Sequence, residues 1–210
     1  MNRLLDIHTH HLPLQAGTAI VNCPPETFAP QPGQWYSVGI HPWHVGERTF
    51  DAEVVRRLLA HPQVLAVGEA GLDKLVSTPM AVQTTLFERQ VQLSEQLGKP
   101  LVIHAVKATE ELLALKRQLA PRTTWVIHGF RGKPALAESL LRHGFCLSFG
   151  EHYHADALRI TPIEALFVET DESEVPVEML YERAAAVRGE TAEQLRTAVS
   201  RNISRLFLHE

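Results

Sequence analysis

Gly98-Lys-Pro-Leu-Val-Ile-His104 joins the end of a helix to a short apolar strand and finishes on a histidine. Thr78-Pro79 supplies an N-cap residue and a first-turn proline for that helix, and Gly98 supplies its C-terminal stop. The continuous apolar run Leu101–Ile103 is typical of a strand that is buried on both faces. A helix followed by such a strand is the unit of an α/β fold with a parallel sheet.

The same unit recurs along the whole chain. Helical patterns, such as those at 108–120 and 134–143, alternate with eight predicted strands: Leu4–Ile7, Ala19–Val21, Tyr36–Ile40, Val64–Val67, Leu101–Ile103, Thr124–Ile127, Phe145–Ser148 and Ala165–Val168. This alternation favours a (β/α)8 TIM-type barrel over a doubly wound sheet. Only about ten residues separate Ile7 from Ala19, too few for a full crossover helix. We therefore expect a compact barrel, a single domain over residues 1–210, with one or two peripheral helices reduced to loops.

Composition restricts the class of protein. The 210 residues carry a formal net charge of −4, which excludes a sequence-wide basic footprint but not a nuclease with a local basic cleft. Cys23 and Cys146 form no CxxC pair, so we expect reduced thiols and a cytoplasmic protein. No apolar stretch reaches the ~18 residues of a membrane span. A barrel of this size buries its core without a partner, so we expect a monomer.

Histidines and acids gather at the ends of the predicted strands. The chain has 12 histidines, and the residues that follow predicted strands are His8 and His10, His41, Glu69, His104, His128 and Asp171. In a parallel barrel the C-terminal strand ends converge on one mouth, where the active sites of such barrels lie. His8 and His10 are two residues apart and share one face of their strand, which suits chelation.

This set of side chains is larger than one tetrahedral metal site needs. It comprises four imidazoles, of His8, His10, His104 and His128, and the carboxylates of Glu69 and Asp171. The set predicts two divalent metal ions bridged by a carboxylate. Nitrogen and oxygen ligands without thiolate suit zinc, manganese, iron or nickel, and the pattern does not distinguish among these four.

A series of short motifs runs in order through nearly the whole chain. They are Asp6-Ile-His8-Thr-His10, Gly39-Ile-His41-Pro42-Trp43, Gly68-Glu69-Ala-Gly71-Leu-Asp73, Gln83-x-x-x-Phe87-x-x-Gln90, Lys99-Pro100-Leu-Val-Ile-His104, Ile127-His128-Gly-Phe130-x-Gly132, Glu169-Thr170-Asp171 and Asn202-x-x-x-Leu206-Phe207. The ordered set resembles the TatD family of metal-dependent hydrolases, within the amidohydrolase-like barrels.

The resemblance implies a role for each of the metal-ligating candidates. His8, His10 and Asp171 would hold one ion, His104 and His128 would hold the other, and Glu69 would bridge the two. A water with its pKa lowered by the metals would be the nucleophile, and Asp171 would also take its proton. His41 would be a substrate contact or would support a ligand, and Asp6 would accept a hydrogen bond at the end of its strand.

The family's activity implies cleavage of phosphoester bonds, with DNase or exonuclease action at DNA ends. A phosphate needs cations beyond the metals, and Lys74, Lys107 and Arg131 follow site-forming strands closely enough to form a local basic cleft. Trp43 follows the His41-Pro42 turn and is a candidate for lining the pocket and stacking on a base.

Two departures from the family pattern leave the substrate open. Lys107 directly precedes Ala108, where the family has an arginine two residues before the alanine, and lysine offers phosphate a point charge in place of arginine's planar fork. Glu172-Ser173-Glu174 replaces a small residue and proline, and adds carboxylates that repel a polyanion. Two alternatives therefore stand beside the nuclease: a hydrolase of a small phosphomonoester, amide or ester, and a metal-binding protein without catalysis.

Overall fold

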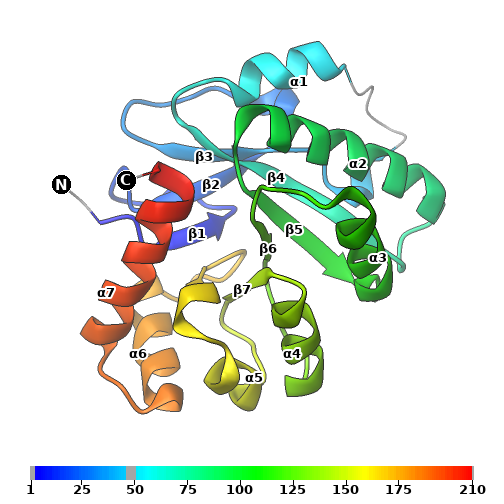
Figure 1. Cartoon of the computed structure of the whole chain (residues 1–210). Coiled ribbons are helices and arrows are strands. Elements are labelled where there is room, and N and C mark those ends of the chain that lie inside the picture. The colour runs from blue at the N-terminus through cyan, green and yellow to red at the C-terminus, as the bar shows by residue number, and fades with distance from the viewer. Residues whose placement is uncertain (1–2, 46–50, 210) are drawn as a thin grey trace.

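The computed structural model describes residues 3–45 and 51–209. Eight parallel strands form one sheet in the order β1 to β8, and the sheet curls into a barrel (Figure 1). The strands are β1 (Asp6–Thr9), β2 (Ala19–Cys23), β3 (Trp35–Val38), β4 (Val64–Asp73), β5 (Leu101–Val106), β6 (Trp125–Ile127), β7 (Phe145–Phe149) and β8 (Leu166–Val168). The expected TIM-type barrel is thus confirmed.

The barrel closes where β1 meets the end of β8. Asp171, just beyond β8, donates its backbone N–H to the His8 carbonyl at 2.9 Å and accepts the N–H of His10 at 2.9 Å. The Asp6 carboxylate adds to this junction, because it accepts hydrogen bonds from Thr170 N, at 3.1 Å, and from Thr170 Oγ1, at 2.6 Å. Closure therefore brings the first and last strand ends of the mouth together.

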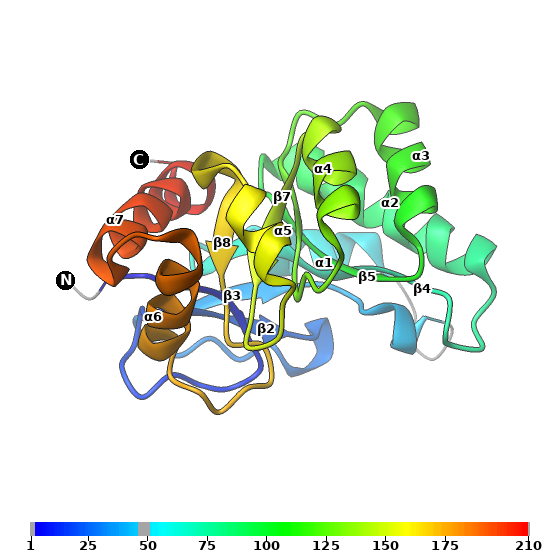
Figure 2. The same cartoon turned by 90° about the horizontal axis from the view of Figure 1, so that it is seen from below.

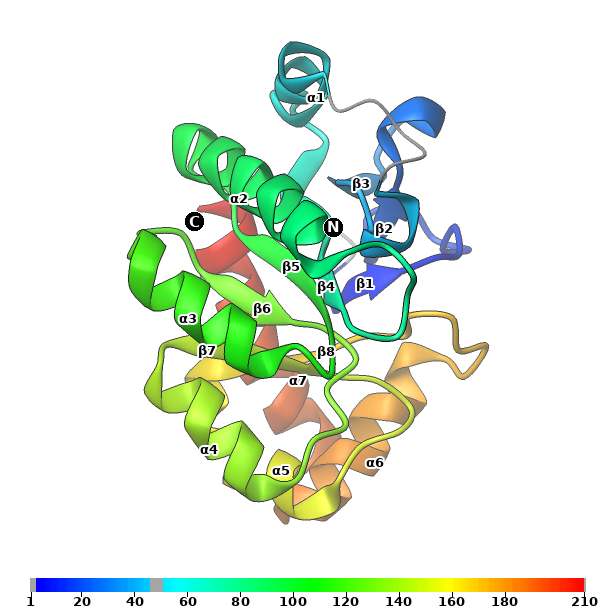
Figure 3. The same ribbon diagram turned by 90° about the vertical axis from the view of Figure 1, so that its right-hand side faces the viewer.

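The helices cover the outside of the barrel, and the first two connections lack a full one (Figures 1 and 3). Only loop joins β1 to β2, and only the 3₁₀ turn η1 (Pro25–Thr27) interrupts the β2–β3 connection. This confirms the reduced crossovers predicted from the short gap between Ile7 and Ala19. The helical elements that follow are η2 (Pro42–His44), α1 (Ala52–Leu59), α2 (Met80–Leu97), α3 (Thr109–Leu119), α4 (Pro134–Arg142), α5 (Ala155–Ile160), η3 (Ile163–Ala165), α6 (Val177–Arg188), α7 (Ala192–Ile203) and the π-helical turn η4 (Ser204–Leu208).

Strand ends differ from the prediction at the mouth. β4 continues to Asp73 and β5 to Val106, so Glu69 and His104 lie inside strands, as does His8 in β1. The apolar runs stop earlier than the backbone pairing, because the polar side chains that follow project into the mouth while the ladder continues. Gly71 pairs with His104 in the β4–β5 register.

The predicted N-cap of α2 is wrong in detail. Pro79 precedes the helix, and Thr78 Oγ1 instead donates to the Val45 carbonyl at 3.3 Å. Gly98 ends the helix as predicted. The difference follows from a tertiary contact, since the loop after η2 offers Thr78 an acceptor that the sequence does not show.

The apolar core fills the barrel and the space under the helices. The two described ends of the chain, near Arg3 and His209, lie on the same side of the molecule (Figure 2). Cys23 is buried, Cys146 is half-buried, and both are free thiols. Across residues 3–45 and 51–209, none of the helices is both long and apolar enough to cross a membrane.

Candidate metal centre

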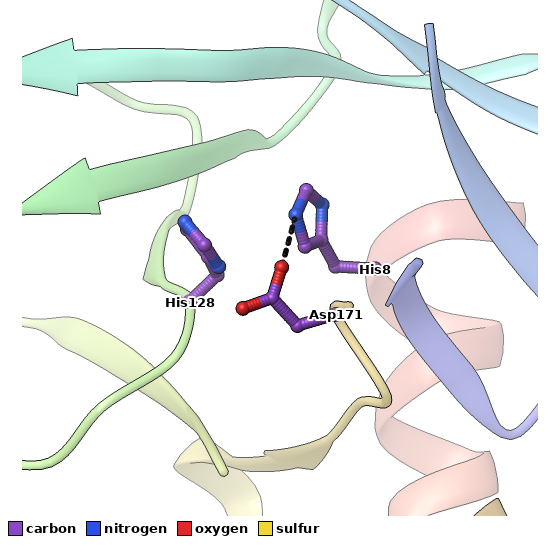
Figure 4. A group of neighbouring side chains, drawn as sticks. All are labelled: His8, His128 and Asp171. Carbon is purple, nitrogen blue, oxygen red and sulfur yellow. Dashed lines mark ion pairs between the residues drawn. The ribbon is translucent and has the colours of Figure 1, made fainter. Parts of the chain in front are cut away.

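The structure brings all six predicted ligands to the barrel mouth. His8 lies in β1, Glu69 in β4 and His104 in β5, whereas His10, His128 and Asp171 stand just beyond β1, β6 and β8. Figure 4 shows His8, His128 and Asp171 from separate elements directed toward one another. Five of the six predicted ligands, all but the fully buried His8, line a cavity of about 360 Å³. His41, Trp43 and Glu172 line the same cavity.

Glu69 occupies the middle of this group. Its Oε1 lies 2.9 Å from His104 Nδ1, 2.8 Å from His128 Nε2 and 3.1 Å from His41 Nε2. Its Oε2 lies 3.5 Å from the Nε2 atoms of both His8 and His10. A carboxylate reached from both sides by imidazoles has the position that a bridging ligand needs.

Glu69 and His128 shift each other's pKa in opposite directions. Burial raises the pKa of Glu69, but the charge of His128 and the histidine hydrogen bonds together hold it well below its usual range. For His128, burial lowers the pKa, and the carboxylates of Glu69 and Glu169 raise it well above its usual range. Glu69 is therefore a buried anion in this arrangement, which favours cationic partners at the mouth.

His8 provides the test of whether a metal fits. Its side chain is fully buried, and among residues 3–45 and 51–209 neither ring nitrogen has a hydrogen-bond partner. The nearest carboxylate oxygens are those of Glu69, at 3.5 Å, and Asp171, at 3.6 Å, which is too far for a good hydrogen bond. A buried polar group without a partner is costly unless a ligand completes it.

Three groups of donors in the described chain are compact enough to hold an ion. They are His8–His128–Asp171, His8–His10–Glu69 and His41–Glu69–His104, each with its donor atoms within 4.8 Å of one another. Imidazole and carboxylate donors without thiolate suit a divalent transition metal. The donor set and the unpartnered His8 nitrogens thus both fit divalent metal ions.

His41 lies against Glu69, but a hydrogen bond from the Trp43 backbone to its ring disfavours a role as a metal ligand. The backbone N–H of Trp43 donates to His41 Nδ1 at 3.1 Å, so in the neutral ring Nε2 carries the proton. Burial lowers the pKa of His41, which favours that neutral form. Nε2–H is then a donor toward Glu69 Oε1, as expected of a residue that supports the site or contacts substrate.

Two carboxylates that the sequence motifs did not mark as functional lie behind the histidines. Asp73 Oδ2 lies 3.3 Å from His104 Nε2 and accepts the indole N–H of Trp43 at 2.8 Å. Glu169 Oε1 lies 3.3 Å from His128 Nδ1. Carboxylates in this position fix the ring orientation of ligating histidines. Their signal was present as spacing, because Asp73 lies four residues after Glu69 in one strand and Glu169 lies two before Asp171.

Asp6 accepts hydrogen bonds at the strand end, as predicted. In addition to Thr170, it accepts the backbone N–H of His8 at 3.2 Å. Burial raises its pKa to about 7, against the lowering effect of these hydrogen bonds.

The three predicted cations separate in the structure. Lys107 and Arg131 line a second cavity of about 530 Å³ beside the metal centre, together with His104, His128 and Asp171. Lys74 lines neither cavity, because its Nζ is paired with Glu111 Oε1 from α3 at 2.7 Å. Two of the three residues therefore stand together at this second cavity, whereas the exposed Glu172 lines the central cavity and, together with Arg131, a third one.

Comparison with known proteins gives the family. The sequence model of the TatD related DNase family matches residues 26–208. The human 3'-5' RNA nuclease TATDN2 is 37% identical over 152 residues, which cover 65% of this chain and 20% of that protein. The uncharacterized metal-dependent hydrolase YcfH of Escherichia coli (strain K12) is 31% identical over 194 residues, which cover 82% of this chain and 73% of that protein. The chain thus spans about a fifth of the human relative's length.

The fold comparison agrees. The crystal structure of YJJV, a TatD homologue from Escherichia coli K12, superposes with a TM-score of 0.82 at 23% identity, covering 91% of this chain and 86% of that chain. A TatD family hydrolase from Entamoeba histolytica gives a TM-score of 0.77 at 12% identity. His8 and His10 precede the matched range of the family model, but the barrel brings them against its other candidate ligands. With the family model matching most of its length, the chain belongs to the TatD family of metal-dependent hydrolases.

Proposed function

We propose that this chain is a two-metal phosphodiesterase that removes nucleotides from nucleic acid ends. The observation that carries the proposal is the convergence of four imidazoles and two carboxylates around the buried, unpartnered ring of His8. His8, His10 and Asp171 would hold one ion, His104 and His128 the other, and Glu69 would contact both. When bound, such ions lower the pKa of a water and neutralise charge that develops on a phosphate.

Asp171 is the proposed proton acceptor for the attacking water. Its side chain is 25% exposed at the mouth, and its Oδ1 lies 3.6 Å from His8 Nε2 and 3.5 Å from His10 Nε2. The residue adopts a left-handed backbone with φ of +56°, a conformation that often marks functional positions. The hydrogen bonds to His8 and His10 hold the backbone in this position.

Cations beside the centre support an anionic substrate. Lys107 and Arg131 would contact its phosphates, and the Nε2–H of His41 would donate to a phosphate oxygen or to Glu69. Two relatives have nuclease names: the human 3'-5' RNA nuclease TATDN2 and the 3'-5' ssDNA/RNA exonuclease TatD of Erwinia tasmaniensis. We extend that substrate class to this chain and propose that residues 1–210 act as a single-domain monomer.

One observation favours a second candidate. Glu172 lines the central cavity, and the described residues that line this cavity include no lysine or arginine. A carboxylate there repels a long polyanion more than a small, singly anchored substrate. Hydrolysis of a small phosphomonoester or ester is therefore the alternative activity of the same centre.

The test is metal content and DNA cleavage on one preparation. Protein loaded with manganese or zinc is given end-labelled single-stranded DNA, beside Glu69→Gln and, as a matched control, Glu138→Gln on the exposed face of α4. We expect about two ions per chain, a ladder of shortened products, and loss of both in Glu69→Gln alone. Two bound ions with intact DNA and turnover of small phosphomonoesters would replace the nuclease by the alternative. No bound metal under any loading would refute both.

A further inference from the structure

A second cavity opens beside the metal centre and has a different character from the first. It measures about 530 Å³, within the range of small-molecule sites, and shares Trp43, His104, His128 and Asp171 with the central cavity. A ligand in this second cavity, which we call the side cavity, therefore lies next to the reacting centre.

The bed of the side cavity is apolar. β5, α3, α4 and the loop after β6 surround it, and these elements lie together on one flank of the barrel (Figure 3). The apolar side chains that line it include Val106, Leu112, Phe130, Leu136 and Leu140. Gly132 keeps the bed compact, since a Cβ there would stand 2.6 Å from the Phe130 ring and 2.8 Å from Leu136.

Two cations stand at the same cavity without protein partners. Lys107 and Arg131 are exposed and line the side cavity, and neither makes an ion pair or hydrogen bond with any residue in the described ranges. Lys107 also has a left-handed backbone, with φ of +52°, directly after β5. A non-glycine residue in that conformation is strained, and such strain is concentrated at functional positions. Unpaired cations above an apolar bed suit a ligand that is anionic at one end and apolar at the other.

Trp43 supplies an aromatic wall between the two cavities. The residue is 58% exposed, yet its indole N–H donates to the buried carboxylate of Asp73 at 2.8 Å. An exposed indole held by its own N–H is a fixed surface on which a flat ring stacks with little loss of entropy.

We infer that the side cavity binds the nucleobase of the nucleotide adjoining the scissile phosphate, with Lys107 and Arg131 on that nucleotide's phosphate. The inference rests on the proposed function, which it deepens by adding a base to the substrate. Of the ligand classes that join a flat apolar ring to an anion, a nucleotide matches the bed, the indole and the two cations together. Because stacking accepts every base, the subsite selects for an unpaired base and not for a sequence.

The experiment compares ligands with and without a base. The 5′-phosphonate analogue of deoxyadenosine and 2-deoxyribose 5-phosphonate carry the same anion, and a phosphoester hydrolase does not cleave their C–P bonds. Binding of each to metal-loaded protein is measured by titration calorimetry. We expect the base to tighten binding by about tenfold or more, the effect of one stacked base.

Matched variants locate the base. Leu136 and Leu141 are both half-buried leucines of α4, and Leu136 alone of the two lines the side cavity. Leu136→Ala should remove most of the preference for the base, Leu136→Met should restore it, and Leu141→Ala should keep it. Arg131→Gln should weaken both ligands by the same factor.

The outcomes separate this inference from the proposed function. Equal affinity for the two phosphonates, or an equal effect of Leu136→Ala and Leu141→Ala, would overturn the base subsite even if DNA is cleaved. A preference for the base that depends on Leu136, in protein that leaves DNA intact, would support the subsite and refute the nuclease.

Discussion

Replacing Gly71 by alanine tests the closest backbone approach beneath the metal centre. A Cβ at this position would lie 2.0 Å from the carbonyl oxygen of His104, whereas real Cβ contacts essentially never fall below 3.0 Å. Gly71 and His104 are paired residues of β4 and β5, so about 1 Å of relief must come from separating two central strands. The φ of Gly71, +157°, adds strain for any L side chain.

These terms give the magnitude. Overpacking costs about 1–3 kcal/mol, and an unfavourable backbone conformation costs a similar amount. We expect Gly71→Ala to lower the free energy of unfolding by about 3 kcal/mol or more, which corresponds to a Tm lower by roughly 6–12 °C in a chain of this size. His104 should move with its strand, so metal content should fall as well.

Gly150→Ala is the matched control. Its Cβ would meet the nearest atom, the Glu169 carbonyl oxygen, at 3.7 Å, an ordinary contact. Thermal unfolding of both variants, with metal analysis of each, makes the comparison. A Gly71→Ala protein that melts within about 2 °C of the parent and keeps its metal would show that the strands do not approach as described.

Three further changes test other parts of the structure. Asp73→Asn should weaken metal binding by about 10–100-fold, because the residue orients His104; unchanged affinity in a chelator competition would contradict this. Burial raises the pKa of Glu95, but hydrogen bonds from Thr123 outweigh it and hold the pKa at about 2. The stabilisation from Glu95 is therefore complete above the pKa of an unfolded glutamate, near 4.3, and is lost as the pH falls toward 2. Glu95→Gln should lower the free energy of unfolding by about 1–3 kcal/mol at pH 7 and by little at pH 2. A stability difference between parent and variant that stays constant with pH in urea unfolding would refute this. Burial lowers the pKa of Lys116 to about 8, below the value of an unfolded lysine, so protein stability should rise between pH 8 and 10.4. Lys116→Met should remove that rise and stabilise the protein by about 1–2 kcal/mol at pH 7. A rise that persists in the variant would exclude Lys116 as its source.

The strands were predictable because each has an apolar run long enough to stand out from its surroundings. Their ends were not, since Glu69 and His104 continue strands whose apolar character has already ceased. Backbone pairing extends β4 and β5 to the mouth, and pairing is a property of two segments that no single run displays. The same limit explains Thr78, whose acceptor belongs to a distant loop.

The metal-ligating candidates were also predictable, because their spacing relative to the strands places them at one end of a parallel barrel. Roles that depend on a partner were not. Lys74 is a free cation in the sequence and a paired one in the structure, since Glu111 reaches it from α3, which follows the next strand. The role of Asp73 and Glu169 in orienting histidines follows only from the structure, where they lie within 3.3 Å of the rings of His104 and His128.

The junction of β1 with β8 serves the fold and the site at once. Asp171 pairs with the backbone of both His8 and His10, and the Asp6 carboxylate binds the residue before Asp171. The same hydrogen bonds that close the barrel therefore set the distance between three candidate ligands. An open barrel separates these ligands, and an ion that binds all three favours the closed one, so metal binding and closure must stabilise each other. The β1–β2 connection is a loop, so it contributes no helix that could pack against the junction of β1 with β8. The backbone hydrogen bonds of His8, His10 and Asp171 hold that junction together.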